Sequence, residues 1–214
     1  MLRTRFWFPT LLCSVALSCP LLKAEGPGQD SQPQTKHVRI LTVGNSFTHN
    51  ATRYLNDIAQ AAGHKLTQKM LSIGGSPLER HATMALAFEK DPSDSSAKYA
   101  NDDSLPQALQ SESWDVVTIQ QASIKSHDVE TYRPYAEQLA DIVHRYAPQA
   151  QLLVHQTWAY RKDDPRFSGP PKTVGEPATQ AEMYRGLSDA YSTITTELSA
   201  RRIPVGDAFW LVDN

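Results

Sequence analysis

The chain has 214 residues, of which 40% are hydrophobic and 21% are charged, and its formal net charge is -2. This balance excludes the strongly basic class of nucleic-acid-binding proteins, so we expect no nucleic acid among its partners. The length suits a single domain once an N-terminal leader is set aside.

The first 24 residues have the pattern of a secretory signal peptide. Arginines give a basic start, an apolar run covers residues 6–22, and Ala24 is a small residue at which cleavage can occur. Two prolines interrupt the apolar run, which falls short of the roughly 20 apolar residues of a spanning helix. We expect export to the periplasm or the extracellular space, with no stable membrane insertion after cleavage. Lipoprotein anchoring at Cys19 is a minor alternative.

Both cysteines, Cys13 and Cys19, lie in this leader, so the mature chain is expected to form no disulfide and no cysteine metal site. Residues 25–36, EGPGQDSQPQTK, are polar and rich in Gly, Pro and Gln, which predicts a flexible linker. Folding is expected to begin near His37, so that residues 37–214 form one monomeric domain.

Strands and helices alternate along this domain. A run of β-branched and apolar residues predicts a buried strand at 38–43, and apolar residues at helical spacing predict a helix that stops at Gly63. A weaker strand signal covers 66–73, and a helix follows from Pro77, a residue that suits the first helical turn.

The alternation continues to the end of the chain. The predicted elements are helices at 104–111, 132–147 and 180–202, and strands at 114–121, 150–158 and 203–210. Five strands alternating with helices predict an α/β fold, with a flavodoxin-like, parallel five-stranded sheet in a three-layer α/β/α arrangement. Such folds bind ligands outside the carboxyl ends of their strands.

Small and polar residues follow four of the predicted strands. They are Asn45 and Ser46, Gly74 to Ser76, Gln120 to Ser123, and Gln156 to Tyr160. Three interpretations of Ser46 stay open: a helix cap, part of an anion site, or a nucleophile beside groups that stabilise an oxyanion. The turn lacks the glycines and lysine of a phosphate-binding loop, and a cap alone does not account for the other loops.

These blocks resemble the SGNH (GDSL-like) hydrolases. VRILTVGNSFT looks like their first block, in which a Gly-Asp/Asn-Ser turn carries the nucleophile, and LSIGGSPLERH resembles the second, whose glycine N–H enters the oxyanion hole. WDVVTIQQAS lies where the strand of the third block is expected, and LLVHQTWAY looks like an uncharacterised bacterial branch of these hydrolases. The resemblance runs from about Val38 to the end of the chain.

The resemblance implies a serine esterase with Ser46 as its nucleophile. The N–H groups of Ser46 and Gly75 are then expected to bind the oxyanion. The third donor of the family, an Asn in a Gly-x-Asn motif, has no counterpart here, and the side chain of Gln120 or Gln121 is the substitute. We slightly favour Gln120, and a capping contact to a neighbouring loop is the alternative for either glutamine.

Four further residues are expected to contribute to substrate binding: Asn45, His81, Trp158 and Tyr160. Aromatic rings at the edge of a site can stack on sugar faces, which favours an acetyl ester of a carbohydrate, while ordinary packing is the alternative. His81 either forms a hydrogen bond across the edge of the site or lies on the surface of its helix. No histidine pair has metal-ligand spacing, so we expect no metal and no cofactor.

The general base is the main departure from the family pattern. SGNH hydrolases resemble one another in a C-terminal Asp-x-x-His, whose His deprotonates the serine. The chain ends at VGDAFWLVDN, with no His after His155. Three accounts stay open: the sequence is a fragment, the base is His155, His127 or His81, or catalysis has been lost.

The fragment account is favoured at this stage. A sheet that ends with a strand at 203–210 lacks the helix that would cover its last face. For His155 we favour a satisfied core histidine over a catalytic role. The rival function is a non-catalytic glycan-binding module on the same fold.

Overall fold

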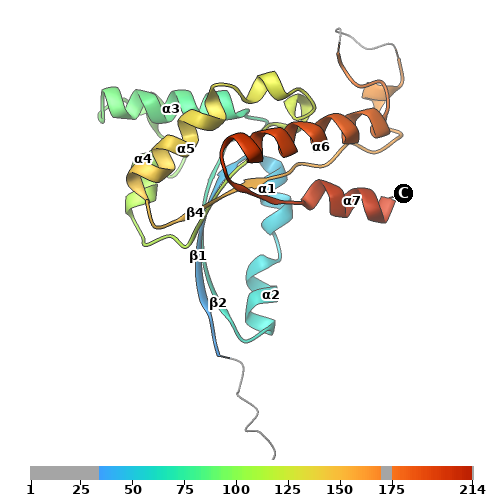
Figure 1. The fold of residues 1–214 in the computed structure, drawn as a ribbon. Coiled ribbons are helices and arrows are strands. Elements are labelled where there is room, and N and C mark those ends of the chain that lie inside the picture. The colour runs from blue at the N-terminus through green and yellow to red at the C-terminus, as the bar shows by residue number, and fades with distance from the viewer. Residues whose placement is uncertain (1–33, 170–174, 214) are drawn as a thin grey trace, which may run out of the picture. The chain divides into compact units, whose positions relative to one another are not determined.

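A five-stranded parallel sheet in the order β2-β1-β3-β4-β5 lies at the centre of the fold (Figure 1). The structure is a computed structural model that describes residues 34–169 and 175–213, so the predicted signal peptide and most of the predicted linker lie outside the described residues. The strands are β1 (His37–Gly44), β2 (Lys65–Ser72), β3 (Val116–Ile119), β4 (Gln151–His155) and β5 (Arg201–Ile203). This sheet confirms the predicted α/β fold class.

Helices connect the strands. They are α1 (Ser46–Thr52), α2 (Leu55–Ala61), α3 (Leu78–Lys90), α4 (Leu105–Gln110), α5 (Tyr135–Tyr146), α6 (Gln180–Glu197) and α7 (Val205–Asp213), with short 3-10 turns η1 (Ser95–Ala97), η2 (Ser123–Lys125), η3 (Val129–Tyr132) and η4 (Pro165–Phe167). In α5, which lies within the helix predicted at 132–147, Ala136, Leu139, Ala140 and Val143 are buried, as their helical spacing requires. No helix among residues 34–169 and 175–213 is long and apolar enough to cross a membrane.

The two faces of the sheet are covered unequally. Leu41 pairs with Val117, and Val117 pairs with Leu152, so these three buried side chains share one face. They form a continuous core with side chains of α3, α4, α5 and α6. Figure 1 shows α1 and α2 on the opposite side of the sheet from α4 and α5.

The helix predicted before Gly63 is divided into two short helices. Thr52 ends α1, Leu55 begins α2, and α2 buries none of its residues. Ile58, one of the apolar residues at helical spacing in this segment, is 64% exposed. The spacing predicted helical structure correctly, but α2 lies on the less covered face of the sheet and contributes little to the core.

The prediction of a strand over residues 203–210 is wrong. The strand β5 ends at Ile203, and α7 follows directly. Pro204 has no N–H for the sheet, and its carbonyl accepts a hydrogen bond from the Ala208 N–H at 3.1 Å, which starts the helix. A helix therefore follows the last strand. The fragment account was based on a last strand without a following helix, and this basis is removed.

Candidate functional site

Ser46 lies at the carboxyl edge of the sheet, the edge at which the carboxyl ends of the parallel strands meet. It is the first residue of α1, and it is exposed, whereas Asn45 before it is buried. The helix cap is Asn45, whose Oδ1 accepts a hydrogen bond from the Phe47 N–H at 3.0 Å. The hydroxyl of Ser46 forms no hydrogen bond with another described residue, so it is not used as a cap.

Gly44 allows Thr48 and Gln120 to pack closely against the end of β1. A Cβ at this position would lie 2.3 Å from the Thr48 Oγ1 and 3.1 Å from the Gln120 Oε1. Any side chain at position 44 would therefore push these groups away. The glycine of the Gly-Asn-Ser sequence is needed for this close approach.

The Gly74-Gly75 turn is tied to the start of α1. The Ser76 N–H donates to the Ile73 carbonyl at 3.1 Å, and Gly75 has a φ of +66°, as the third residue of a type II turn does. The Asn45 Nδ2 donates to the Ser76 carbonyl at 3.1 Å. These contacts hold the turn against Asn45, the residue that precedes Ser46.

The backbone N–H groups around Ser46 divide into used and unused donors. The Phe47 N–H is bound by Asn45, and the Thr48 N–H donates to the Gln120 Oε1 at 3.2 Å. Within the described part of the chain, the N–H groups of Ser46 and Gly75 form no hydrogen bond. Two backbone donors at this edge are therefore free to bind a negatively charged oxygen.

Gln120 is completely buried and bound on both sides of its amide. Its Oε1 accepts hydrogen bonds from the Thr48 N–H and from the Thr48 hydroxyl, the latter at 2.8 Å. Its Nε2 donates to the Nδ1 of His155 at 2.9 Å. These contacts match the capping alternative, and they direct the amide inward, away from the surface on which Ser46 is exposed.

Gln121 is also buried, and it connects two other loops. Its Oε1 accepts hydrogen bonds from the Leu78 N–H at 3.0 Å and the Ala122 N–H at 2.8 Å. Its Nε2 lies 2.8 Å from the Thr131 carbonyl and 3.2 Å from the Thr131 hydroxyl, and it donates to both. Since both amide hydrogens are used, Gln121 has no donor left for an oxyanion in this arrangement.

His81 and His155 are buried, and neither forms a hydrogen bond with Ser46. The Nδ1 of His81 lies 2.7 Å from the Tyr99 hydroxyl. Burial lowers the pKa of each histidine to about 4, although an interaction with the Gly44 carbonyl opposes the shift of His81. Both imidazoles are therefore neutral at physiological pH. The surface alternative for His81 is wrong, and His155 is a core histidine whose Nδ1 is satisfied.

A cleft of about 610 Å³ extends from the loop after β4 to α6 and α7. Its aromatic lining consists of Trp158, Tyr160, Tyr184, Phe209 and Trp210. The ring centroid of Trp158 lies 4.2 Å from that of Phe47 and 4.6 Å from that of Phe209. Phe47, which follows Ser46 directly, thus packs against Trp158 of the cleft wall, although neither Phe47 nor Ser46 lines the cleft itself.

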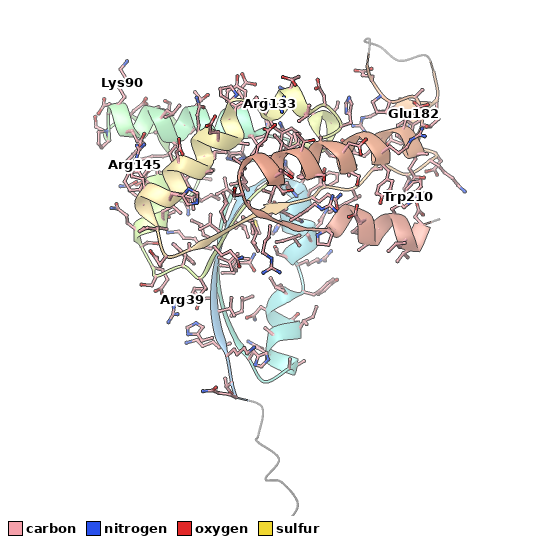
Figure 2. All side chains as sticks on the ribbon, viewed as in Figure 1. Arg39, Lys90, Arg133, Arg145, Glu182 and Trp210 are labelled. Carbon is pink, nitrogen blue, oxygen red and sulfur yellow. The ribbon has the colours of Figure 1, made fainter. Side chains whose placement is uncertain are left out.

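These contacts determine how the predicted aromatic residues can act. Trp158 packs against aromatic rings on two sides, as the packing alternative expected, while Phe209 is half-exposed in the cleft. The guanidinium of Arg166 lies 4.2 Å from the ring centroid of Tyr160. Figure 2 shows Trp210 at the side of α7 that faces α6, where it stacks on Tyr184.

Asp207 fixes the start of α7 to the end of β4. Its Oδ1 accepts a hydrogen bond from the Gln156 Nε2 at 2.8 Å, and its N–H donates to the Gln156 Oε1 at 3.0 Å. Arg202 forms an ion pair with its Oδ2 at 3.0 Å. Neither this pair nor a role for the aromatic residues of α7 was predicted from the sequence, because their segment has the pattern of a strand.

His127, the third candidate base, lies in the loop between η2 and η3. It is partly buried, and burial lowers the pKa of its imidazole. Among residues 34–169 and 175–213, no cluster of three or more His, Cys, Asp and Glu side chains could hold a metal ion.

Comparisons with known proteins identify the family of the chain and structures of similar fold. A family model described as "Domain of unknown function (DUF4886)" matches residues 39–197. A crystal structure of a DUF4886 family protein from Bacteroides uniformis is 24% identical, with a TM-score of 0.67, and the match covers 81% of this chain and 69% of that one. No match to a curated protein was found.

Solved structures of hydrolases also match the chain. A putative GDSL-like lipase from Parabacteroides merdae is 14% identical, with a TM-score of 0.45, and the match covers 83% of this chain and 82% of that one. Phospholipase A1 from Streptomyces albidoflavus is 12% identical, with a TM-score of 0.42, and the match covers 80% of this chain and 81% of that one.

Proposed function

The chain belongs to the DUF4886 family, and we propose from its site that it is an exported serine esterase of the SGNH type, with Ser46 as the nucleophile. One observation carries the proposal. The exposed hydroxyl of Ser46 lies on the same edge as two unused backbone donors, the N–H groups of Ser46 itself and of Gly75. A hydroxyl beside such donors is what acyl transfer requires.

In the proposed reaction the Ser46 Oγ attacks the carbonyl carbon of an ester. The carbonyl oxygen becomes negatively charged, and the N–H groups of Ser46 and Gly75 donate hydrogen bonds to it. Collapse of this intermediate releases the alcohol and leaves an acyl group on Ser46. Water then attacks the acyl group, which releases the acid and restores the hydroxyl.

The reaction needs a base that accepts the proton of Ser46. His81 and His155 form no hydrogen bond with Ser46, and each has a pKa of about 4 because it is buried. We therefore assign the base to a group other than these two histidines. The SGNH resemblance indicates its form, a His oriented by an Asp.

We propose an acetyl ester of a carbohydrate as the substrate. The support is the aromatic cleft, whose wall includes Trp158, in contact with Phe47 next to the serine, and the half-exposed ring of Phe209. Tyr160 lines the same cleft. Export, as the signal peptide predicts, would place the protein where polysaccharides are found.

The test is labelling with a fluorophosphonate, which reacts with activated serines, in the absence and presence of imidazole as an added base. We expect one adduct per chain on Ser46, and faster labelling with imidazole where the chain itself supplies no base. Ser46→Ala removes the adduct, and Ser95→Ala, at an exposed serine outside this edge, keeps it. An adduct that survives in Ser46→Ala contradicts the proposal.

A glycan-binding module without catalysis is the second candidate. It is favoured by the cleft together with the absence, among the described residues, of a hydrogen bond between Ser46 and a base. Acetylated and deacetylated oligosaccharides distinguish the two functions. Binding of both without release of acetate or labelling of Ser46 supports the binding module, whereas release of acetate supports the esterase.

A further inference from the structure

A buried line of hydrogen bonds lies behind Ser46 and connects three elements of the fold. It runs from Thr48 in α1 to Gln120 after β3, and from Gln120 to His155 at the end of β4. Thr48 and Gln120 have no exposed surface, and His155 is 3% exposed. The line therefore crosses the carboxyl edge inside the protein, beneath the surface on which Ser46 is exposed.

The direction of every hydrogen bond in this line follows from the first one. The Thr48 backbone N–H is only a donor, so the atom of Gln120 that faces it must be Oε1. The amide Nε2 then faces His155, and since an amide nitrogen only donates, the Nδ1 of His155 must be an unprotonated acceptor. The proton of the neutral imidazole is therefore on Nε2.

The amide of Gln120 contacts both ends of the turn that presents Ser46. Its Oε1 binds Thr48, which follows the turn, at 2.8 and 3.2 Å. The same oxygen also lies close to Gly44, which precedes the turn, since a Cβ built on Gly44 would lie 3.1 Å from it. Rotation of this amide would break the bonds to Thr48 and leave the turn without its inner support.

We propose that His155 is a positioning residue of the site, whose unprotonated Nδ1 holds the amide of Gln120 in the orientation that fixes the turn of Ser46. The kinetic consequence rests on the proposed function, since it concerns the reactivity of Ser46. The hydrogen-bond arrangement itself does not, and it can be tested without any activity.

The first test is the tautomer of His155 in the unaltered protein. Long-range ¹H–¹⁵N NMR spectra at pH 7 distinguish the two neutral tautomers and the imidazolium, and the signals of His155 are identified by their loss in His155→Asn. We expect a neutral ring with its proton on Nε2. A proton on Nδ1, in either the neutral or the charged form, overturns the proposal.

The second test compares two replacements of His155. Asn offers an oxygen near the position of Nδ1, whereas Leu has a similar volume and no acceptor. We expect His155→Leu to slow the maximal rate of fluorophosphonate labelling at Ser46 by roughly 10- to 100-fold, the scale of a small misplacement of reacting groups. The labelling rate of His155→Asn should stay within about threefold of that of the unaltered protein, because the retained hydrogen bond keeps most of the positioning effect. Equal rates in the two variants overturn the positioning role.

The third test uses Gln120→Glu and does not depend on whether His155→Leu folds. In Gln120→Glu a carboxylate oxygen faces the Nδ1 of His155, and a carboxylate accepts but does not donate. We expect the proton of His155 to move to Nδ1, visible in the same NMR spectrum, and an unchanged ring overturns the proposal. If the unaltered protein is not labelled at all, the proposed function fails, while the tautomer measurements still decide the arrangement.

Discussion

The carboxyl edge of the sheet has two parts that are built differently. At the ends of β1, β2 and β3, buried amides and hydroxyls such as those of Gln120, Gln121 and Thr48 form hydrogen bonds in fixed directions, and His155 at the end of β4 belongs to this part. In the loop after β4 and in α6 and α7, aromatic rings line an open cleft. A hydrogen bond requires a narrow range of distances and angles, whereas contact between apolar surfaces is non-directional and allows different geometries. The first part is therefore suited to hold reacting groups, and the second to accept a substrate.

Acid is expected to weaken the hydrogen-bonded part, with the largest effect on stability. His81 and His155 have a pKa near 6.5 in the unfolded chain and about 4 in the folded protein. The unfolded state therefore binds protons first, and the free energy of unfolding falls as the pH drops from 6.5 to 4, by about 3 kcal/mol for each histidine. Urea unfolding across this range measures the slope. His155→Asn should reduce the slope of the unfolding free energy against pH by the amount that corresponds to about one proton. An unchanged slope contradicts the account.

Gln120→Ala breaks the first part of the edge directly. The Thr48 N–H and hydroxyl lose their partner in a buried place, so we expect the free energy of unfolding to fall by about 2–4 kcal/mol. Gln107→Ala is the matched control, because this exposed glutamine belongs to the capping box of α4 and should cost about 1 kcal/mol. Denaturant unfolding compares the two variants, and equal losses would mean that the buried amide has no special role.

Trp158→Ala tests the second part of the edge. The change removes a ring that packs between Phe47 and Phe209. We expect weaker binding of a carbohydrate ester, with about a tenfold rise in KM, because a partly lost aromatic contact has an effect of this size. Labelling of Ser46 by a small fluorophosphonate should change much less, because the hydrogen-bonded part is intact. Trp158→Phe is the control that keeps a ring. A large loss of labelling with an unchanged KM contradicts this division of the edge.

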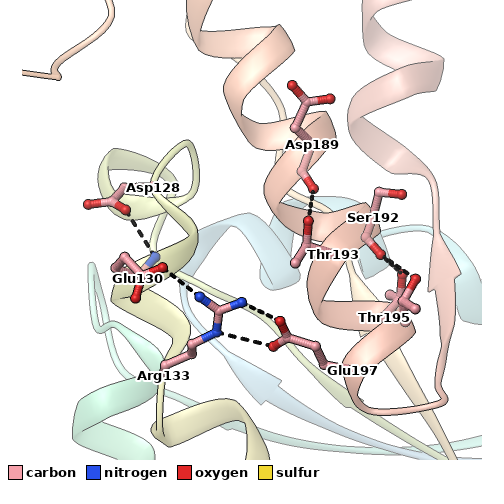
Figure 3. Close-up of polar contacts among 9 residues, drawn as sticks. Asp128, Glu130, Arg133, Asp189, Ser192, Thr193, Thr195 and Glu197 are labelled. Carbon is pink, nitrogen blue, oxygen red and sulfur yellow. Dashed lines mark hydrogen bonds and ion pairs between the residues drawn. The ribbon is translucent and has the colours of Figure 1, made fainter.

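Arg133→Gln should have the smallest effect. Arg133 connects Glu130 in η3 with Glu197 at the end of α6 (Figure 3), and all three side chains are exposed. Exposed ion pairs contribute little, so we expect the melting temperature to shift by less than about 3 °C and the labelling of Ser46 to stay unchanged. Thermal unfolding and labelling measure both. A loss of labelling would show that the site depends on the protein surface far more than its local hydrogen bonds indicate.

The sequence predicts what depends on local pattern. The apolar spacing of α5 and the strand over residues 38–43 can be predicted from the sequence alone, and so can the turns that follow β1 and β2. The assignment of α7 fails because VGDAFW has the β-branched and aromatic residues of a strand, while its helix is anchored by Asp207 on Gln156, 51 residues away.

The roles of the glutamines were out of reach for a related reason. Adjacent residues, Gln120 and Gln121, are chemically identical, and only their distant partners separate them: Thr48 and His155 for one, Leu78 and Thr131 for the other. Nothing in the sequence around a glutamine specifies which atom of its amide faces which partner. That information exists only once the strands are assembled.

The most direct test of the central claim is to find the residue that receives the acyl group. The protein is incubated with p-nitrophenyl acetate, quenched in acid, digested and analysed by mass spectrometry. We expect an acetyl group on Ser46 that accumulates and then disappears as the acyl group is hydrolysed, and that is missing in Ser46→Ala. Acetylation confined to lysines, or equal in the two proteins, would contradict the account.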